Sequence, residues 1–457
     1  MDHSKRSSFT GKIGFVLAAA GSAVGLGNIW RFPYLAAKYG GGLFLLMYIV
    51  LSVTFGFSLM VAEIAIGRKT KLSPVEAYRA LDKRFTFVGY LAALIPMLIL
   101  PYYSVIGGWV MKYAFGFTFG QGAEMATDSF FGSFVTSAAE PVLWFALFIG
   151  ITAVVVLLGV KSGIEKVSKI MMPALIVLML FIVIYTLCTT PGAINGVKYY
   201  VMPDFASLTL ESFVMTVVAA MGQLFYSMSL AMGIMITFGS YMKKEISIEK
   251  STHQIEIFDT GVAFLAGLMI IPAVFAFNPE DLAKSGPTLM FNILPKVFEN
   301  MPAGGVIGAV FFLMVLLAAL TSSISLMETV VSTIQDKWHI NRKISCGIVI
   351  AISIGLGLLS CFGFSIWGGF KPFGLDDILT FFDFLTNNIM MPIVALITVL
   401  LVGYILKPKA MIEEVELEGN KFSWKGMFSI IIRYVAPVFL VIILVSSILN
   451  VTGVITI

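Results

Sequence analysis

The chain has 457 residues, of which 58% are hydrophobic and 12% are charged, and its formal net charge is +4. Charged residues make up about a quarter of a soluble globular domain, so this composition excludes that class and predicts a polytopic membrane protein. The basic residues are spread over many short segments and form no single patch, so we expect no nucleic-acid partner. Three cysteines, an odd number without metal-ligand spacing, predict neither a disulfide framework nor a metal centre.

Eleven apolar runs reach the length of about 20 residues that crosses a bilayer as a helix. In chain order we expect spans near residues 12–36, 42–67, 86–114, 141–160, 166–188, 212–240, 255–277, 304–335, 344–365, 377–405 and 428–455. The first run follows Lys5, Arg6 and Lys12, as the apolar part of a secretory signal peptide would. It continues past the alanines at 18–20, where cleavage would fall, and this favours a retained first span.

The first span contains three glycines within seven residues, Gly21, Gly25 and Gly27, and then the polar residues Asn28 and Arg31. Glycine weakens a helix and lets ligands approach the backbone. One interpretation is a flexible helix whose small residues pack against a neighbouring helix. The other is a broken helix whose freed carbonyls and amides hold an ion and a substrate.

The sixth span has a similar interruption of small and polar residues at residues 222–233. Matching interruptions in spans one and six predict two repeats of five helices each, inverted in the bilayer because five is odd. We therefore expect an all-α polytopic membrane protein with a single transport domain over residues 1–457. Its first repeat covers 1–190, its second covers 205–406, and an extra C-terminal span covers 426–457.

Lys and Arg residues predict the orientation of the spans. With the N-terminus inside, the inner segments carry 23 of these residues and the outer segments carry six. Because inner loops are enriched in Lys and Arg, we expect a cytoplasmic N-terminus and, after eleven spans, an extracellular C-terminus. The inner segment 406–427 mixes acidic and basic residues and is predicted to be a solvated linker.

Two groups of polar residues inside the spans need an explanation. Asp259 stands in an apolar context, where an unpaired carboxylate costs several kcal/mol unless it gains a proton or binds a cation. A helix can accommodate Thr321, Ser322 and Ser323, because their hydroxyls can donate hydrogen bonds to backbone carbonyls one turn earlier. Their hydroxyls are also the oxygen ligands that a hard cation such as sodium prefers. The sequence shows no Ser-His-Asp arrangement and no phosphate-binding loop, so we expect no enzyme.

Together these motifs resemble the neurotransmitter:sodium symporter family, in its bacterial amino-acid branch. The resemblance rests on residues 21–34, on Gly222 and Gln223 with the interruption at 227–233, and on residues 320–323. It implies a five-plus-five inverted-repeat fold with broken helices 1 and 6 and about eleven transmembrane helices. It also implies a sodium-coupled symporter in the bacterial cytoplasmic membrane that imports a neutral hydrophobic or aromatic L-amino acid by alternating access.

The same resemblance implies two sodium sites and a substrate site between the two breaks. The first sodium would bind Ala23, Asn28, Ser227 and Asp259. The second would bind Gly21, Val24, Ala318, Thr321 and Ser322. The residues expected around the amino acid are Ser22, Ala23, Leu26, Gly27, Ile99, Tyr103, Tyr226, Ser227, Ser229, Met232, Ser322 and Leu326.

By the same resemblance, two charged pairs would act as gates. Arg31 with Asp383 would form the outer gate, and Arg6 with Asp336 would form an inner latch supported by Tyr241.

Four single positions refine the resemblance. Gly25 stands where amine-transporting relatives carry an Asp, so a substrate with its own carboxylate is expected. Asp259 would replace the chloride that other relatives bind, so no chloride requirement is expected. Met232 stands where a leucine-preferring relative has Phe, and its flexibility favours larger side chains. Ala231 replaces a glycine of the second break, so the extent of unwinding there stays open.

Two other functions remain open at this point. A sensor or a ligand-gated conductance on the same scaffold would bind sodium and an amino acid without stoichiometric transport. A proton-coupled permease would use Asp259 or Glu63 as its proton carrier. Gates on both faces favour transport, and the ligands Asn28, Thr321 and Ser322 favour sodium because they cannot titrate.

Overall fold

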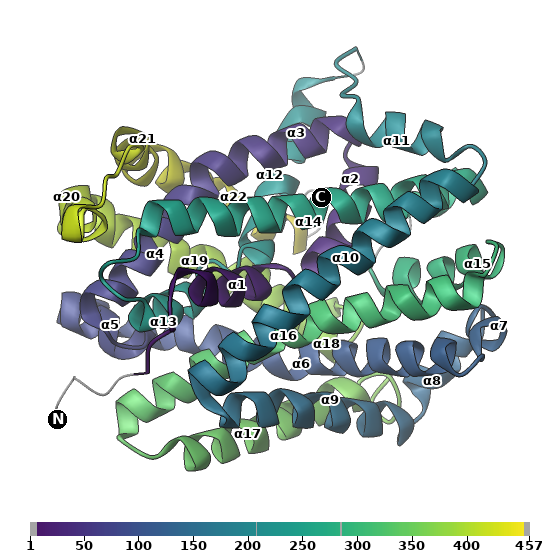
Figure 1. Ribbon diagram of the computed structural model, residues 1–457, viewed down its shortest axis with the longest axis horizontal. Helices are drawn as coiled ribbons and strands as arrows, with labels where there is room; N and C mark the ends of the chain where they lie inside the picture. The colour runs from purple at the N-terminus through teal and green to yellow at the C-terminus, as the bar shows by residue number, and fades with distance from the viewer. Residues whose placement is uncertain (1–6, 207, 284–285, 452–457) are drawn as a thin grey trace.

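The computed structural model describes residues 7–206, 208–283 and 286–451 of the chain. These residues are largely helical, and one isolated antiparallel bridge between Gly41 and Pro203 is the only β-pairing found among them. Figure 1 shows the long helices running side by side between two ends of the molecule. The N-terminus, α5, α13, α20 and α21 lie at one end, and α7, α8 and α15 lie at the other.

The α-helices of the first half of the chain are α1 (Lys12–Ala23), α2 (Phe32–Lys38), α3 (Gly42–Leu51), α4 (Phe57–Thr70), α5 (Pro74–Leu81), α6 (Thr86–Thr118), α7 (Gly122–Met125), α8 (Phe130–Thr136), α9 (Glu140–Leu157), α10 (Lys166–Thr189) and α11 (Ala193–Val201). Those of the second half are α12 (Leu210–Ser227), α13 (Ile234–Tyr241), α14 (Ile248–Phe277), α15 (Leu294–Glu299), α16 (Gly304–Trp338), α17 (Arg342–Phe362), α18 (Ile378–Asp383), α19 (Met391–Leu400), α20 (Lys407–Val415), α21 (Lys425–Ile430) and α22 (Ala436–Val451). Short π-helical segments join several of these helices into longer ones, such as Phe384–Met390 between α18 and α19.

Ten helices of the described chain are long and apolar enough to cross a membrane, and a bent pair brings the number of spans to eleven. The bent pair is span one, in which Lys12–Ala23 meets Gly27–Lys38 at 51°. Spans two to eleven are Gly42–Thr70, Lys83–Thr118, Glu140–Leu157, Val160–Thr189, Leu210–Ser227, Ile248–Phe277, Gly304–Trp338, Arg342–Phe362, Ile378–Ile405 and Lys425–Leu449. The eleven expected spans are therefore confirmed. Span six differs most, because its helix ends at Ser227 and the rest of the expected run forms α13. Elsewhere the largest shift is at the start of span seven, where Ser247 caps the helix by accepting a hydrogen bond from the Lys250 N–H.

Spans one and six are both interrupted, as the sequence predicted. In span one, α1 ends at Ala23 and helical structure resumes at Gly27. In span six, α12 ends at Ser227 and α13 begins at Ile234.

The interruption in span six is held in an unusual backbone conformation. Ser229, Ala231 and Gly233 adopt left-handed φ values of 54°, 61° and 73°. The alanine at 231 therefore does not prevent unwinding, and its N–H donates a 2.7 Å hydrogen bond to Oε1 of Glu63 in span two.

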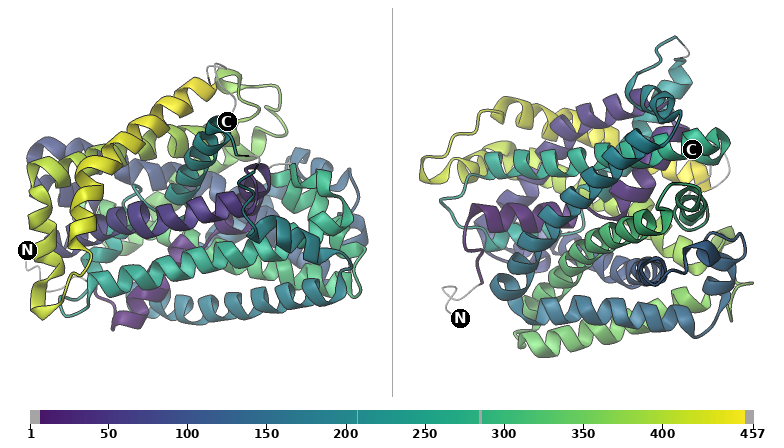
Figure 2. Two further views of the ribbon diagram at one scale, coloured as in Figure 1. Left: turned by 90° about the horizontal axis from the view of Figure 1, so that it is seen from above. Right: turned by 45° about the vertical axis from the view of Figure 1, so that its right-hand side comes forward.

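The two breaks lie inside the bundle, because residues 21–29 and 227–242 are all buried. Helix α1 packs against α10, α14 and α16, and α13 packs most extensively against α4. Most residues of α1 are buried, and the two further views in Figure 2 show the long helices running side by side. The two breaks approach closely, because a Cβ atom on Gly27 would lie only 2.5 Å from the Tyr226 ring.

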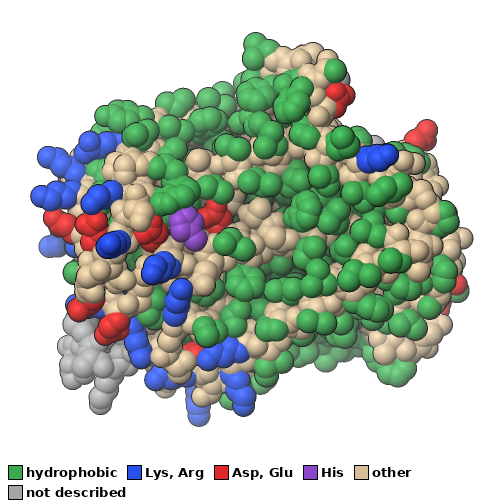
Figure 3. All heavy atoms as spheres, turned by 45° about the horizontal axis from the view of Figure 1, so that its top comes forward, with side chains coloured by type: hydrophobic (Ala, Val, Ile, Leu, Met, Phe, Trp, Pro, Cys, Tyr) green, Lys and Arg blue, Asp and Glu red, His purple; other side chains and the backbone are tan. Residues whose placement is uncertain are grey.

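Charged side chains gather at one end of the molecule. Figure 3 shows Lys and Arg side chains concentrated at one end of the molecule, while hydrophobic side chains cover much of the flank between the ends. An apolar flank between two polar ends is what a bilayer-spanning bundle requires, because its sides contact lipid.

The prediction of a solvated linker at residues 406–427 was wrong. This segment contains α20, and its side chains Met411, Val415 and Phe422 are almost completely buried. Met411 and Val415 are four residues apart and so share one face of α20, which packs against α4. The mixed charges concealed this short apolar face, and one of them, Glu414, is itself buried against Arg68.

Candidate functional site

A cavity lies between the two helix breaks. About 340 Å³ of space that protein atoms do not fill lies among its lining residues, and part of this space is open to solvent. Eleven of the twelve residues expected around the substrate line it, and the exception is Ser227. The full lining is Ser22, Ala23, Gly25, Leu26, Gly27, Ile99, Tyr103, Tyr226, Ser229, Met232, Ile234, Ser322 and Leu326.

One part of the cavity is polar and is formed by the backbone of the first break. The Leu26 N–H donates to the Tyr103 hydroxyl at 3.2 Å, and the Gly25 N–H donates to Oδ1 of Asn28 at 3.1 Å. A Cβ atom on Gly25 would lie 2.6 Å from Oγ of Ser322 and 2.9 Å from the Tyr103 hydroxyl. Glycine at this position therefore leaves space for a ligand beside the backbone N–H groups of the break.

The remaining lining is largely apolar. Ile99, Met232, Ile234 and Leu326 are each at most 4% exposed, and the Tyr226 ring joins them from α12. Ile234 was missed by the sequence interpretation, because it is the first residue of α13 and follows the polar interruption. Nothing in the apolar run that contains it distinguishes a residue facing the cavity from one facing another helix.

Three of the four residues expected at the first sodium site meet around the carboxylate of Asp259, which is completely buried. Asn28 Nδ2 donates to Asp259 Oδ1 at 2.8 Å, and the Ser227 hydroxyl donates to the same oxygen at 2.7 Å. The Tyr48 hydroxyl lies 2.8 Å from the other oxygen, Oδ2, and 3.0 Å from the Ser227 hydroxyl. Ser227 therefore faces this cluster and not the cavity, whereas Ala23 lines the cavity.

Tyr48 was not predicted from the sequence. It lies in the apolar span two, and only the tertiary structure brings it beside residues of spans one, six and seven.

Oxygen atoms also converge where the second sodium site was expected. The Ser322 hydroxyl lies 3.1 to 3.4 Å from the carbonyl oxygens of Gly21, Ser22 and Val24. The Thr321 hydroxyl lies 3.0 Å from the carbonyl oxygen of Ala318. A hydroxyl has one proton and cannot donate to three carbonyls at once, so this set suits a bound cation.

Both clusters present oxygen ligands, which are the ligands that hard cations prefer. No group of three or more His, Cys, Asp or Glu side chains that could hold a metal ion comes together in the described parts of the chain. The donor sets at the two clusters therefore fit sodium better than a transition metal, which favours nitrogen and sulfur ligands.

The residues expected at the outer gate lie near the cavity without contacting one another. The Arg31 guanidinium lies over the Tyr226 ring, 5.6 Å from its centroid. Asp383 Oδ1 accepts hydrogen bonds from Asn387 Nδ2 at 2.6 Å and from the Tyr102 hydroxyl at 3.2 Å. Arg31 and Asp383 are both described residues, and no ion pair joins them in this structure.

Packed side chains form a cover around Tyr241, the residue expected to support the inner latch. The Tyr241 hydroxyl donates to Oε1 of Glu328 at 2.8 Å, and the buried Glu328 also forms an ion pair with the partly exposed Arg342. Phe9 is completely buried, and its N–H donates to the Tyr241 carbonyl at 3.2 Å.

Of the expected inner latch, Asp336 accepts a 2.8 Å hydrogen bond from the Ser73 N–H. Its expected partner, Arg6, lies outside the described residues. Glu328 and Arg342 were not predicted as part of this cover.

The chain matches the model of the sodium:neurotransmitter symporter family over residues 6–123 and 134–455. It is a member of that family. It is 34% identical to a sodium-dependent transporter of Bacillus subtilis, YhdH, and the match covers 98% of this chain and 99% of the relative. It is 27% identical to the human sodium- and chloride-dependent GABA transporter 2 over 82% of this chain and 69% of that protein.

A solved structure is similar along nearly the whole chain. This is the crystal structure of MhsT in complex with L-phenylalanine, with a TM-score of 0.86 and 34% sequence identity. The similarity covers 97% of this chain and all of the MhsT chain. The expected family and the expected transporter fold are therefore confirmed, and the protein is a multi-pass membrane protein of a family of sodium-dependent transporters.

Proposed function

We propose that this protein is a symporter that uses the sodium gradient to import a neutral hydrophobic or aromatic L-amino acid by alternating access. The observation that carries the proposal is the cavity between the two breaks, which is polar where the backbone is free and apolar elsewhere. Sodium-ligand candidates lie on the broken helices that form it. The cell membrane would be the bacterial inner membrane, with the N-terminus in the cytoplasm and the C-terminus outside.

The lining of the cavity favours an amino acid over an amine. Among the described residues that line it, none is Asp, Glu, Lys or Arg. A positively charged amine alone would lack a counter-ion there, whereas an amino acid brings its own carboxylate. We propose that this carboxylate binds near the Leu26 N–H and the Tyr103 hydroxyl, which already contact one another. The apolar walls then receive the side chain, and the L-phenylalanine bound by MhsT is an example of such a ligand.

Two sodium ions would bind at the two oxygen clusters. Asn28, Ser227 and Asp259, with the Ala23 carbonyl, would hold the first ion. The carbonyls of Gly21, Val24 and Ala318, with Thr321 and Ser322, would hold the second and thereby tie α1 to α16. Because Asp259 supplies a permanent carboxylate, we propose that transport needs no chloride.

Sodium would drive the cycle by favouring one conformation. A ligand shifts a conformational equilibrium only as far as it binds one state better than the other. The second ion bridges the first broken helix and α16, so it would stabilise the state in which Phe9, Tyr241 and Glu328 cover the inner end. Loss of that ion would allow the cover to open inward, while Arg31 and Asp383 come together at the outer end.

Uptake by the purified protein in proteoliposomes tests this function. We expect radiolabelled phenylalanine, tyrosine or leucine to accumulate above equilibrium with an inward sodium gradient. Replacing sodium by potassium should abolish accumulation, and replacing chloride by gluconate should leave it unchanged.

The other functions have different outcomes in the same experiment. Sodium-dependent binding without accumulation would identify a sensor. Uptake that persists without sodium and follows a proton gradient would identify a proton-coupled permease.

A further inference from the structure

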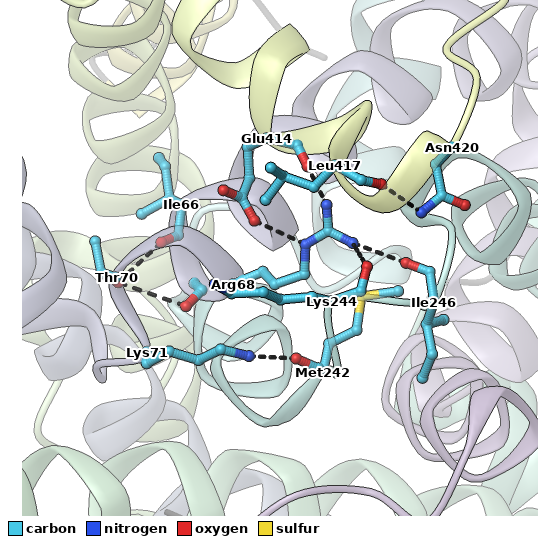
Figure 4. Close-up of polar contacts among 11 residues, drawn as sticks. Ile66, Arg68, Thr70, Lys71, Met242, Lys244, Ile246, Glu414, Leu417 and Asn420 are labelled. Carbon is cyan, nitrogen blue, oxygen red and sulfur yellow. Dashed lines mark hydrogen bonds and ion pairs between the residues drawn. The ribbon is translucent and has the colours of Figure 1, made fainter. Parts of the chain in front are cut away.

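A completely buried arginine, Arg68, lies at the inner end of span two and belongs to none of the sites proposed above. Arg68 Nε donates to Oε1 of Glu414 at 2.8 Å, and a second nitrogen, Nη2, donates to the Glu414 carbonyl. Its Nη1 donates to the carbonyls of Ile246 at 2.7 Å and Lys244 at 3.4 Å. Figure 4 shows the guanidinium enclosed by these acceptors, which come from two separate segments.

The first of these segments belongs with the inner half of span six. Residues 242–246 connect α13 to α14, and Lys71 Nζ also donates to the Met242 carbonyl. The backbones of α4 and α13 touch directly, because a Cβ on Gly67 would lie 1.9 Å from the Ile236 carbonyl oxygen. A Cβ on Gly239 would lie 2.4 Å from the Ile64 carbonyl oxygen. Helices α4 and α13 therefore form one closely packed unit, which we call the α4–α13 unit.

The second segment continues directly from span ten. Span ten (Ile378–Ile405) carries Asp383 in its outer half and leads through Leu406 into α20, where Glu414 is located. Lys407 at this corner has a φ of 62° although a proline follows it. Residues before proline rarely adopt helical conformations, so the docking of α20 must hold this corner.

Other contacts fasten the remainder of the same segment to span seven. The Ser423 N–H donates to Oε1 of Glu249 at 3.0 Å, and the Trp424 N–H donates to the same atom at 3.3 Å. The Trp424 ring packs against His253, which is stacked on Phe57 of α4 with ring centroids 4.4 Å apart. The segment is therefore bound to the α4–α13 unit and to span seven at two places.

We propose that Arg68 and Glu414 form a clamp that couples the outer gate to the inner half of span six. The clamp pins the inner end of span ten to the α4–α13 unit. Movement of that unit then displaces span ten, which bends at its π-helical segments Phe384–Met390 and Leu401–Ile405 and shifts Asp383 relative to Arg31. Arg68 and Glu414 are positioning residues, and this inference rests on the proposed alternating-access function.

The buried guanidinium of Arg68 needs its acceptors in fixed positions. A buried guanidinium has five N–H donors, and each one left without an acceptor is costly. Nearby α20 carries a second ion pair, Lys409 with Glu413, whose side chains are 84% and 62% exposed and 3.9 Å apart. Exposed pairs of this kind contribute little, so Glu413 provides a control one residue away from Glu414.

The test compares Glu414→Gln with Glu413→Gln in the full-length protein. For Glu414→Gln we expect equilibrium binding of phenylalanine in sodium to stay within about twofold of wild type, because Glu414 does not line the cavity, whereas turnover in proteoliposomes falls about tenfold. Glu413→Gln should preserve both quantities. Hydrogen–deuterium exchange should show that sodium with phenylalanine protects residues 376–390 in the wild type and in Glu413→Gln, but not in Glu414→Gln.

Specific results would overturn the clamp. It is refuted if Glu414→Gln transports and protects residues 376–390 as the wild type does, or if it loses binding and turnover together. Arg68→Lys, which keeps the charge but cannot contact all four acceptors, provides a second variant and should show the same separation of binding from turnover. Failure of the wild type to accumulate amino acid would instead refute the proposed transport function, and binding and exchange would still report on the clamp.

Discussion

The break in span one covers residues 24–26, whereas the break in span six covers residues 228–233 and contains three left-handed residues. Two of those three, Ser229 and Ala231, are not glycine, and a left-handed conformation costs them about 1 kcal/mol or more. The first break follows from its own glycines, while the second is held by neighbours such as Glu63. The two breaks line the same cavity, but local sequence creates one and tertiary contacts create the other.

The largest effect should come from filling the space beside the first break. Gly25→Ala places a methyl group within 3 Å of Ser322 Oγ and the Tyr103 hydroxyl, so we expect amino-acid affinity to fall about 100-fold. Gly222→Ala is the matched control, because a Cβ there meets no atom within 4 Å. Equilibrium binding of radiolabelled phenylalanine measures both, and equal effects would contradict the proposed cavity.

The second break should depend on its contact with span two. Glu63→Ala leaves the buried Ala231 N–H without its acceptor, so we expect about 2 kcal/mol loss in the free energy of unfolding. Glu63→Gln keeps an amide oxygen at the same place and should lose less. Thermal unfolding of the purified variants compares them, and a Glu63→Ala protein as stable as wild type would show that the break holds itself.

Removing one ligand of the proposed second sodium site should have a moderate effect. Thr321→Ala takes a hydroxyl from the oxygen cluster, and we expect the sodium concentration for half-maximal uptake to rise about tenfold. Ser323→Ala is the control, because that neighbouring buried hydroxyl is already bonded to Thr152 and to the Leu320 carbonyl. Unchanged sodium dependence in Thr321→Ala would remove this residue from the site.

The smallest expected effect is a gain in stability and not a loss. Ala231→Gly should relieve the left-handed strain in the second break and raise the free energy of unfolding by about 0.5 to 1 kcal/mol. Ala220→Gly, in the regular part of α12, should lower it by about 1 kcal/mol. Thermal unfolding distinguishes them, and a loss of stability in Ala231→Gly would show that the alanine methyl group contributes packing that outweighs the strain.

Much of the fold could be predicted from the chain alone. Hydrophobic run length determines where a helix can cross a bilayer, because every backbone polar group must be satisfied within the lipid. The eleven spans followed from this constraint, and the interruption of span one followed from Gly21, Gly25 and Gly27. The family followed from short motifs around the breaks. Most of the residues that line the cavity followed from the resemblance to that family, and their functional roles stay predictions.

Only the tertiary structure decided which residues meet across those breaks. Tyr48 joins the Asp259 cluster, Ile234 faces the cavity, and the N–H of the left-handed Ala231 donates to Glu63. The burial of Met411, Val415 and Phe422 was also hidden, since charged residues in a short segment predict solvent exposure unless a partner is known. Glu414 has that partner in Arg68, 346 positions earlier in the chain, and a local pattern carries no information about a contact at that separation.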